Sequence, residues 1–231
     1  MPQTIDNIDR FFISIFNGSG SMFIDELTLL LTNGLAWIPL YLALIVLVVK
    51  NNEKFSQVML LLGAVALALL LSDGMADYIV KPLVGRLRPV CDPALKGSVT
   101  IINGYIPSGY SFFSAHAANT VAVALLLSIV VRNSVFSLFM AFWSMLNCWT
   151  RLYLGVHYMS DIIVGILWGA VSAIIAYIIY RKLYFKVSPR LHYISSQYTR
   201  SGYSLSDIDM VLNVMVLTIV IAVILACYLA C

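Results

Sequence analysis

Charge is scarce in this sequence. Asp, Glu, Lys and Arg make up only 11% of the 231 residues, whereas a soluble globular domain has about 25%. Hydrophobic residues reach 61% and the mean hydropathy is +0.92. These values exclude an ordinary soluble domain and indicate an integral membrane protein. The net charge of +3 comes from dispersed basic residues that mostly follow apolar runs, so no nucleic-acid partner is expected.

Cofactor motifs are lacking as well. The four cysteines show no Cys-x-x-Cys spacing, and no pairing can be read from their positions. No group of Asp and Glu residues offers a magnesium site, so we expect neither a metal nor an organic cofactor. A cleavable signal peptide is not expected either, because Asp6, Asp9 and Arg10 lie inside the first apolar piece.

Long apolar runs are what the sequence has in abundance. Six of them approach the length of a bilayer: residues 35–49, 57–80, 114–131, 135–152, 162–183 and 209–230. Two shorter amphipathic pieces, 5–16 and 22–32, precede them and are separated by the breaker NGSGS. We therefore predict an all-α membrane protein, a bundle of six transmembrane helices with N-terminal interfacial or re-entrant helices.

This pattern divides the chain into four parts. They are interfacial or re-entrant helices over 1–34, a transmembrane core over 35–183, a cytoplasmic segment over 184–208 that contains His192, and a C-terminal transmembrane helix over 209–231. Connections between spans alternate sides. Residues 50–56, 132–134 and 184–208, with the adjoining Arg181 and Lys182, carry eight of the 14 cations; the opposite side carries six. This bias places the first set in the cytoplasm and residues 81–113 and 153–161 outside.

Polar side chains concentrate near this outward face. Three separate segments deliver three cations, two of the three histidines, a serine and an aspartate to it: Lys81, Arg88, Ser114, His116, Arg151, His157 and Asp161. Each residue alone has an ordinary structural explanation, such as an arginine that reaches the interface from a helix end. Pro82 and Pro89 are expected to stop the second span from continuing as regular helix.

The combination indicates phosphate chemistry. Three fixed cations suit an anion with tetrahedral oxygens. Ser114 and the backbone N–H groups at a helix start add further donors. A histidine with an aspartate behind it is an oriented nucleophile or base, and a second histidine can protonate a leaving group. The residues therefore point to metal-independent phosphoryl transfer to water, with the cations in place of a metal.

At these residues the sequence resembles the type 2 phosphatidic acid phosphatases. Their first motif, Lys, six residues, Arg-Pro, matches KPLVGRLRP, and the core of their third motif matches TRLYLGVHYMSD at full spacing. Their second motif, Pro-Ser-Gly-His, corresponds to FSAH. The resemblance implies that His157 is the nucleophile, that Asp161 orients it and that His116 is the acid. It also implies that Lys81, Arg88, Ser114, Arg151 and the amide of Ala115 bind phosphate.

The sequence departs from these motifs in places. Phe113 replaces the usual Pro and Ala115 the usual Gly, which leaves the amide but disfavours a positive φ. Thr150 replaces Ser, and Met159 replaces a common Pro. The tripeptide Pro107–Gly109 contains Pro-Ser-Gly but lacks the histidine, so we interpret it as an ordinary loop turn.

Asp73, Asp77, Asn119 and Asn147 are further polar residues inside predicted spans. Asp77 lies four residues before Lys81, and an ion pair between them would orient the lysine side chain. Asp77 then either supports phosphate binding through Lys81 or forms a purely structural ion pair, and the sequence leaves both open. Asn119 and Asn147 are expected to bind neighbouring helices rather than substrate.

The expected function is removal of phosphate from a lipid phosphate or diphosphate at the outer face, because the site lies at the membrane–water boundary, where a head group can enter while its tails stay in the lipid. Undecaprenyl diphosphate, phosphatidylglycerol phosphate, phosphatidic acid and lipid A phosphates all remain candidates, and the oligomeric state is not readable. The alternatives are a phosphotransferase with a lipid phosphate donor, a non-catalytic lipid-binding or transport protein on the same scaffold, and a vanadate-dependent peroxidase, against which the spans argue. A bacterial inner membrane, with the site facing the periplasm, is the expected location.

Overall fold

The computed structural model describes residues 3–187 and 196–231, so His192 and the middle of the predicted cytoplasmic segment lie outside the described residues. Within the described part every regular element is helical, which confirms the all-α prediction, and the only pairing of strand type there is an isolated bridge between Tyr198 and Ser204.

The helices follow the predicted runs closely. The α-helices are α1 (Gln3–Phe16), α2 (Met22–Thr32), α3 (Ile38–Lys50), α4 (Phe55–Gly74), α5 (Lys81–Val84), α6 (Ala115–Val131), α7 (Ser134–Tyr153), α8 (Met159–Val187) and α9 (Leu205–Leu229). A π-helical stretch, η2 (Met75–Val80), joins α4 to α5. Short 3-10 turns complete the chain: η1 (Gly34–Trp37), η3 (Pro89–Cys91), η4 (Pro93–Leu95) and η5 (Ile102–Gly104).

Only part of the predicted span count is supported by length and apolarity. Three segments among the described residues pass both criteria: Phe55–Leu95, Met159–Tyr184 and Leu205–Leu229. A fourth is added if α2 and the helix after it, which meet at an angle of 68°, form one broken span. Helix α6 is apolar but only 17 residues long. The number of six spans therefore stays a prediction.

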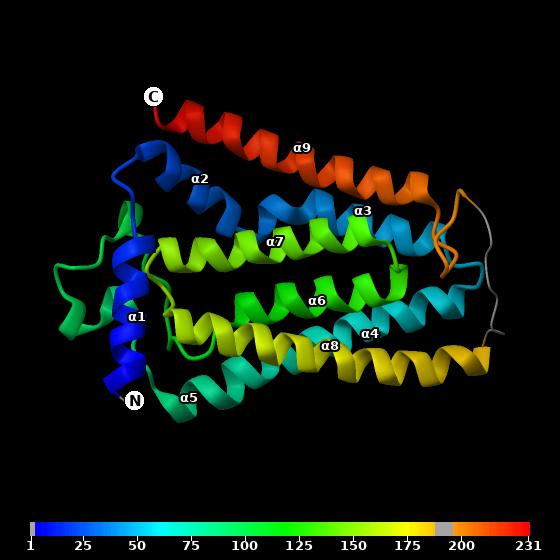
Figure 1. The fold of residues 1–231 in the computed structure, drawn as a ribbon, viewed down its shortest axis with the longest axis horizontal. Coiled ribbons are helices and arrows are strands. Elements are labelled where there is room, and N and C mark those ends of the chain that lie inside the picture. The colour runs from blue at the N-terminus through cyan, green and yellow to red at the C-terminus, as the bar shows by residue number, and fades with distance from the viewer. Residues whose placement is uncertain (1–2, 188–195) are drawn as a thin grey trace.

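The long helices run roughly alongside one another, and α1 lies across one end of them (Figure 1). Helices α4, α6, α7 and α8 pack together, and α9 packs along α2 and α3. Gly165 and Gly169 let α8 approach α6 closely, because a Cβ at Gly169 would lie 2.3 Å from the carbonyl oxygen of Ala118. This approach brings the start of α6 against the start of α8.

The two ends of the bundle differ in what they carry. The turns 51–54 and 132–133 and the segment 196–204 lie at one end, and α1, both termini and the long 85–114 connection lie at the other (Figure 1). This matches the predicted sorting of loops into two groups. At the first end Asp207 of α9 bonds both Lys50 and Asn51, which ties the C-terminal helix to α3.

The helix after η2 runs further than the sequence predicts. Pro82 was expected to stop it, but α5 continues through Pro82 to Val84 and ends at Gly85 in the left-handed conformation, with φ of +61°. Proline is tolerated in the first turn of a helix, where its missing N–H is not needed. The wider π-helical stretch precedes it and changes the hydrogen-bonding register there.

Candidate active site

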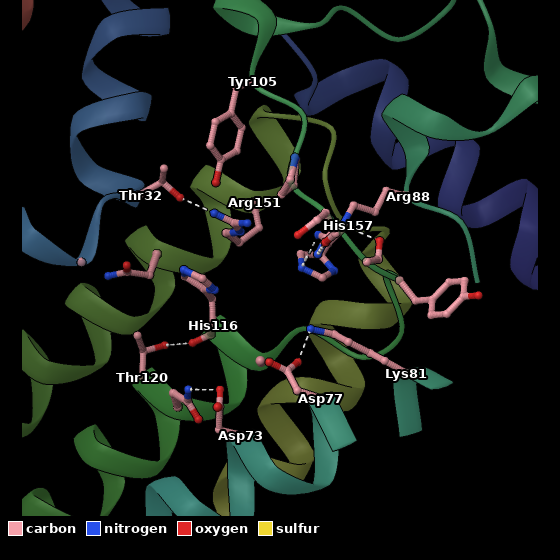
Figure 2. A pocket seen from close by; sticks show the side chains of 18 of the residues that line it. Thr32, Asp73, Asp77, Lys81, Arg88, Tyr105, His116, Thr120, Arg151 and His157 are labelled. Atoms are coloured by element: carbon pink, nitrogen blue, oxygen red, sulfur yellow. Dashed lines mark hydrogen bonds and ion pairs between the residues drawn. The ribbon is translucent and has the colours of Figure 1, made fainter. Parts of the chain in front are cut away.

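A cavity of about 590 Å³ opens at the end of the bundle that carries α1. Six chain segments contribute to its wall: α2 with η1, α3, the α4–α5 segment, the 85–114 connection, α6, and α7 with the turn after it. Of the predicted residues, Lys81, Arg88, Ala115, His116, Arg151, His157 and Asp77 line it. Figure 2 shows most of these side chains directed toward one space.

His157 lies in the short turn between α7 and α8. Gly155 makes this turn possible, because it has φ of +62° and a Cβ there would lie 2.8 Å from Val99. The imidazole is only 2% exposed. Burial lowers the pKa of His157 to about 4, although the Asp161 carboxylate opposes this shift. The ring is therefore neutral at pH 7, and a neutral ring has a nitrogen lone pair available for attack.

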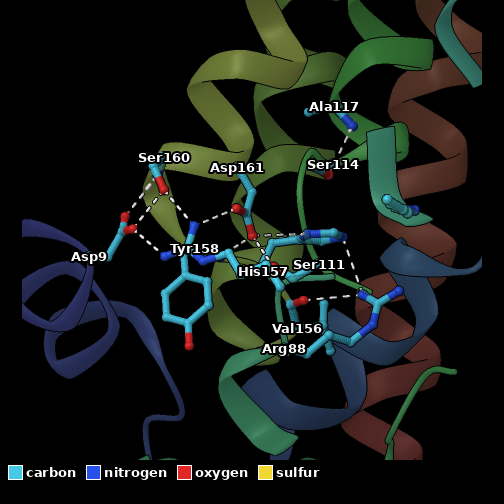
Figure 3. Close-up of polar contacts among 12 residues, drawn as sticks. Asp9, Arg88, Ser111, Ser114, Ala117, Val156, His157, Tyr158, Ser160 and Asp161 are labelled. Atoms are coloured by element: carbon cyan, nitrogen blue, oxygen red, sulfur yellow. Dashed lines mark hydrogen bonds and ion pairs between the residues drawn. The ribbon is translucent and has the colours of Figure 1, made fainter. Parts of the chain in front are cut away.

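Asp161 lies behind His157, in the first turn of α8, and is fully buried. One carboxylate oxygen stands 3.5 Å from Nδ1 of His157, an ion-pair distance that is too long for a good hydrogen bond. The same oxygen accepts from the hydroxyl of Ser111 and, at 2.9 Å, from the amide of Tyr158 (Figure 3). Asp161 does not line the cavity, as expected of a residue that acts through the histidine.

Arg88 is fixed beside the opposite edge of the His157 ring. Its Nη1 lies 3.3 Å from Nε2 of His157 and donates to the carbonyl of Val156 at 3.1 Å. Its remaining nitrogens donate to the carbonyls of Ser108 and Gly109 at 3.0 and 3.2 Å. Within the described residues this guanidinium, 6% exposed, has no carboxylate partner.

Arg151 enters the cavity from α7. It is 2% exposed, its Nη1 donates to the hydroxyl of Thr32 at 2.5 Å, and its buried Nε has no hydrogen-bond partner. None of the ion pairs formed by the described residues includes Arg151. Two buried guanidiniums without a counter-ion raise the free energy of the empty site, and an anion bound between them would lower it.

Lys81 forms the predicted ion pair with Asp77, with Nζ 2.5 Å from a carboxylate oxygen. The pair spans i,i+4 across the join of η2 and α5, and both residues line the cavity. Asp77 is half exposed, whereas Lys81 is largely covered. The Asp77 carboxylate therefore orients the lysine toward the cavity and is itself accessible from the cavity (Figure 2).

The start of α6 brings only part of the predicted second motif to the cavity. His116 is exposed to the space, and Ala115 lines it. Ser114 is fully buried and does not line the cavity. Its hydroxyl instead accepts from the amide of Ala117 at 3.4 Å, as the N-cap of α6, and its own amide donates to the carbonyl of Asp161. The structure thus gives Ser114 a structural contact where the sequence predicted a phosphate ligand.

Several residues of the site were not predicted from the sequence. The loop at Pro107–Gly109, interpreted as an ordinary turn, lines the cavity and supplies two carbonyl acceptors to Arg88. Thr32 and Tyr105 also line it. No motif marks these positions, and only the partial Pro-Ser-Gly match gave a signal. Asn119 donates to Asp73 of α4 at 2.9 Å, as expected of a contact between helices, yet both also line the cavity.

The arrangement is suited to binding a phosphate group. A neutral imidazole nitrogen lies between cationic side chains, and a second imidazole is exposed to the same space. An oxyanion in that space would lie against the buried side chains of Arg88 and Arg151, where electrostatic stabilisation is stronger than in water.

Comparisons with known proteins show what this chain is similar to. Residues 57–185 match the sequence pattern of the PAP2 superfamily. A lipid A 4′-phosphatase of Bacteroides thetaiotaomicron is 33% identical over 79% of this chain and 81% of the relative. A lipid A 4′-phosphatase of Porphyromonas gingivalis is 30% identical over 78% of this chain and 74% of the relative. The crystal structure of Aquifex aeolicus LpxE matches 67% of this chain and 82% of its own, with 23% identity and a TM-score of 0.47.

Proposed function

Because this chain belongs to the PAP2 superfamily and is a phosphatase of lipid phosphates, we propose that it hydrolyses a lipid A phosphate monoester by a metal-independent phosphohistidine mechanism. The observation that carries the proposal is the pair of buried guanidiniums, Arg88 and Arg151, beside the neutral imidazole of His157. Such a site lacks only a multiply charged anion to balance its charge.

In the proposed reaction, Nε2 of His157 attacks phosphorus in line with the bond to the lipid oxygen. That bond breaks, and His116 gives its proton to the departing alkoxide. Water, deprotonated by His116, then attacks the phosphohistidine and releases inorganic phosphate. Lys81, Arg88, Arg151 and the amide of Ala115 bind the non-bridging oxygens, where charge accumulates in the transition state.

The lipid A assignment rests on the two relatives and is supported by the cavity beyond the histidines. Its wall includes Asp73, Asn119, Asn147 and Tyr41, which offer more hydrogen-bonding groups than a phosphate on glycerol requires. The hydroxyls of a sugar head group can form hydrogen bonds with these side chains. The volume of about 590 Å³ lies in the usual range for a site that encloses a small ligand.

A panel of lipid phosphates offered to the purified protein tests this function. We expect free phosphate to be released fastest from lipid A, with a product lighter by one HPO₃ unit, and more slowly from phosphatidic acid, phosphatidylglycerol phosphate and undecaprenyl diphosphate. Equal rates on all four would reject the lipid A assignment. A product in which the phosphate has moved to an added acceptor would favour a phosphotransferase, and no release from any lipid would favour a binding protein.

Chelation tests the absence of a metal from the mechanism. We expect full activity in EDTA, because the cations near His157 take the place of a metal, and we expect competitive inhibition by vanadate, whose five-coordinate form resembles the transition state. Loss of turnover in EDTA that added magnesium restores would contradict the mechanism.

A further inference from the structure

An aspartate of the N-terminal helix is buried at the base of the active site. Asp9 of α1 is fully buried, although α1 lies outside residues 57–185, which match the family. Its Oδ1 accepts from the amide of Ser160 at 2.9 Å, and its Oδ2 accepts from the hydroxyl of Ser160 at 2.6 Å (Figure 3). Asp9 thus caps the first turn of α8, where the helix dipole favours a negative charge.

Arg86 connects this aspartate to the residue that orients the nucleophile. Its Nη2 lies 2.6 Å from Asp9, and its Nη1 lies 2.7 Å from Oδ1 of Asp161 and 2.8 Å from the hydroxyl of Ser160. The guanidinium also lies over the ring of Tyr158, 3.6 Å from its centroid. Arg86 is therefore fixed by two carboxylates, a hydroxyl and an aromatic face.

These contacts fix the Asp161 carboxylate at both oxygens. Arg86 occupies Oδ1, while Ser111 and the amide of Tyr158 occupy Oδ2, the oxygen that faces Nδ1 of His157. Without Arg86, the carboxylate would lose the charged contact that sets its rotation. A buried carboxylate that loses its cation also becomes a stronger base.

We propose that Arg86 and Asp9 are positioning residues for the nucleophile: Arg86 holds the Asp161 carboxylate in register with His157, and Asp9 holds Arg86. The proposal rests on the proposed phosphohistidine mechanism. When Nε2 of His157 bonds to phosphorus, the ring becomes positive, and an anionic Asp161 at a fixed distance from Nδ1 stabilises that charge. The Arg86 cation makes Asp161 a weaker base, which keeps the Nδ1 proton on the ring.

Docking of α1 does not depend on Asp9 alone. Asn17 anchors the end of the helix, because its amide donates to the carbonyl of Tyr153 at 2.9 Å and to that of Thr100 at 3.1 Å. Ile13 is also buried. Loss of the charge at position 9 should therefore disturb Arg86 before it detaches the helix.

The test compares Arg86→Gln, Arg86→Lys, Asp9→Asn and the double variant Asp9→Asn/Arg86→Gln. The control is Asp6→Asn, which breaks the exposed ion pair between Asp6 and Arg10 on the same helix. Each full-length protein is measured for kcat and KM on the lipid phosphate that the wild type hydrolyses best, for binding of inorganic phosphate by calorimetry, for inhibition by orthovanadate, and for thermal unfolding.

Arg86→Gln should lower kcat by roughly tenfold or more with KM and phosphate affinity within about twofold, because ground-state phosphate binding uses other cations. Vanadate, which needs the nucleophile in place, should bind correspondingly more weakly. Arg86→Lys should recover part of kcat. Asp9→Asn should have a smaller effect, and the double variant should resemble Arg86→Gln, since Asp9 acts through Arg86. Asp6→Asn should match the wild type.

Other outcomes overturn the inference. If kcat and vanadate inhibition of Arg86→Gln equal those of the wild type, Arg86 does not position the nucleophile. If instead the fall in kcat matches the fall in the number of phosphate-binding sites per protein, and the unfolding temperature falls with it, Arg86 is only a structural contact of α1. Failure of the proposed function looks different, because the wild type itself would then release no phosphate from any lipid of the panel.

Discussion

At the scale of single residues, the two histidines of the site differ in exposure, and this difference predicts two kinds of failure. His157 is buried against Asp161, and His116 is exposed to the cavity. His157→Ala should stop the reaction with every substrate, because no phosphoenzyme can form. His116→Ala should lose most activity on a lipid phosphate but keep much more on an aryl phosphate, whose leaving group needs no proton.

Phosphate release by both variants on both substrates measures this. The wild type must first accept the aryl phosphate, and its ratio of the two rates is the control. If the aryl substrate rescues His157→Ala and not His116→Ala, the two roles are exchanged.

The second prediction at this scale is a loss of activity when Arg151 is replaced. Arg151→Lys should lower kcat/KM by roughly tenfold or more, about 1.4 kcal/mol of transition-state stabilisation, because an ammonium cannot contact Thr32 and a phosphate with a planar fork. The measurement is steady-state hydrolysis of the preferred lipid. Arg10→Lys, at an exposed ion pair on α1, is the matched control and should change nothing. An unchanged rate for Arg151→Lys would make Arg151 a structural residue only.

The sequence could predict that two histidines and three cations lie around one space, because the segments that carry them begin or end on the same side of the predicted bundle. It could not predict that Ser114 faces Ala117, since a serine before a helix can cap it or bind a ligand with equal ease. It also could not connect Asp9 with Arg86, 77 residues apart, because only tertiary packing brings them together.

At the scale of helices, the close approach of α8 to α6 predicts a loss of stability. Gly169→Ala would place a Cβ 2.3 Å from a backbone oxygen of α6, which cannot move without displacing the helix. We expect a cost of about 1–3 kcal/mol, as for an overpacked core. Thermal unfolding in detergent measures it. Gly63→Ala in α4 is the control, because nothing lies within 4 Å of the Cβ it would add.

Equal unfolding temperatures for the two alanine variants would contradict this packing. A fall in activity larger than the fall in stability is also expected for Gly165→Ala, because its Cβ would lie 2.6 Å from the carbonyl of Ser114, next to Ala115 and His116. That variant tests whether the position of α6 against α8 sets the geometry of the site.

Helix positions were predictable to within a few residues because each run is both apolar and bounded by polar turns. The extension of the second span beyond Pro82 was not, because it depends on the local π-helical geometry, which has no distinctive composition. The N-terminal part was predicted to end at residue 34, but the bend between α2 and η1 that places Thr32 beside Arg151 was not predicted.

At the scale of the whole molecule, the two ends of the bundle predict an accessibility pattern. With the four native cysteines replaced by serine, Lys96→Cys should be labelled from outside intact cells by an impermeant maleimide, and Ser196→Cys only after lysis. Both positions are exposed, and the segments that contain them, the 85–114 connection and 196–204, lie at opposite ends of the bundle. The excess of cations at the end that carries the 51–54 and 132–133 turns is the physical reason. The reverse pattern would place the active site in the cytoplasm and change the pool of substrates.

The general architecture was predictable because composition and span spacing limit the chain to a helical membrane bundle. The transverse position of α1 is less accessible to sequence reasoning. Its exposed apolar residues, Ile8, Phe11 and Ile15, fit an interfacial helix, but its buried aspartate fits only the packed structure.

The contact between Arg88 and Nε2 of His157 has a consequence for the empty enzyme. The nitrogen expected to attack phosphorus already accepts a guanidinium N–H at 3.3 Å. A phosphate oxygen placed against Arg88 competes for that same N–H, so arrival of the substrate and release of the attacking lone pair are coupled. In the empty site the attacking lone pair is therefore engaged by Arg88, and a ligand with anionic oxygens that binds Arg88 would release it.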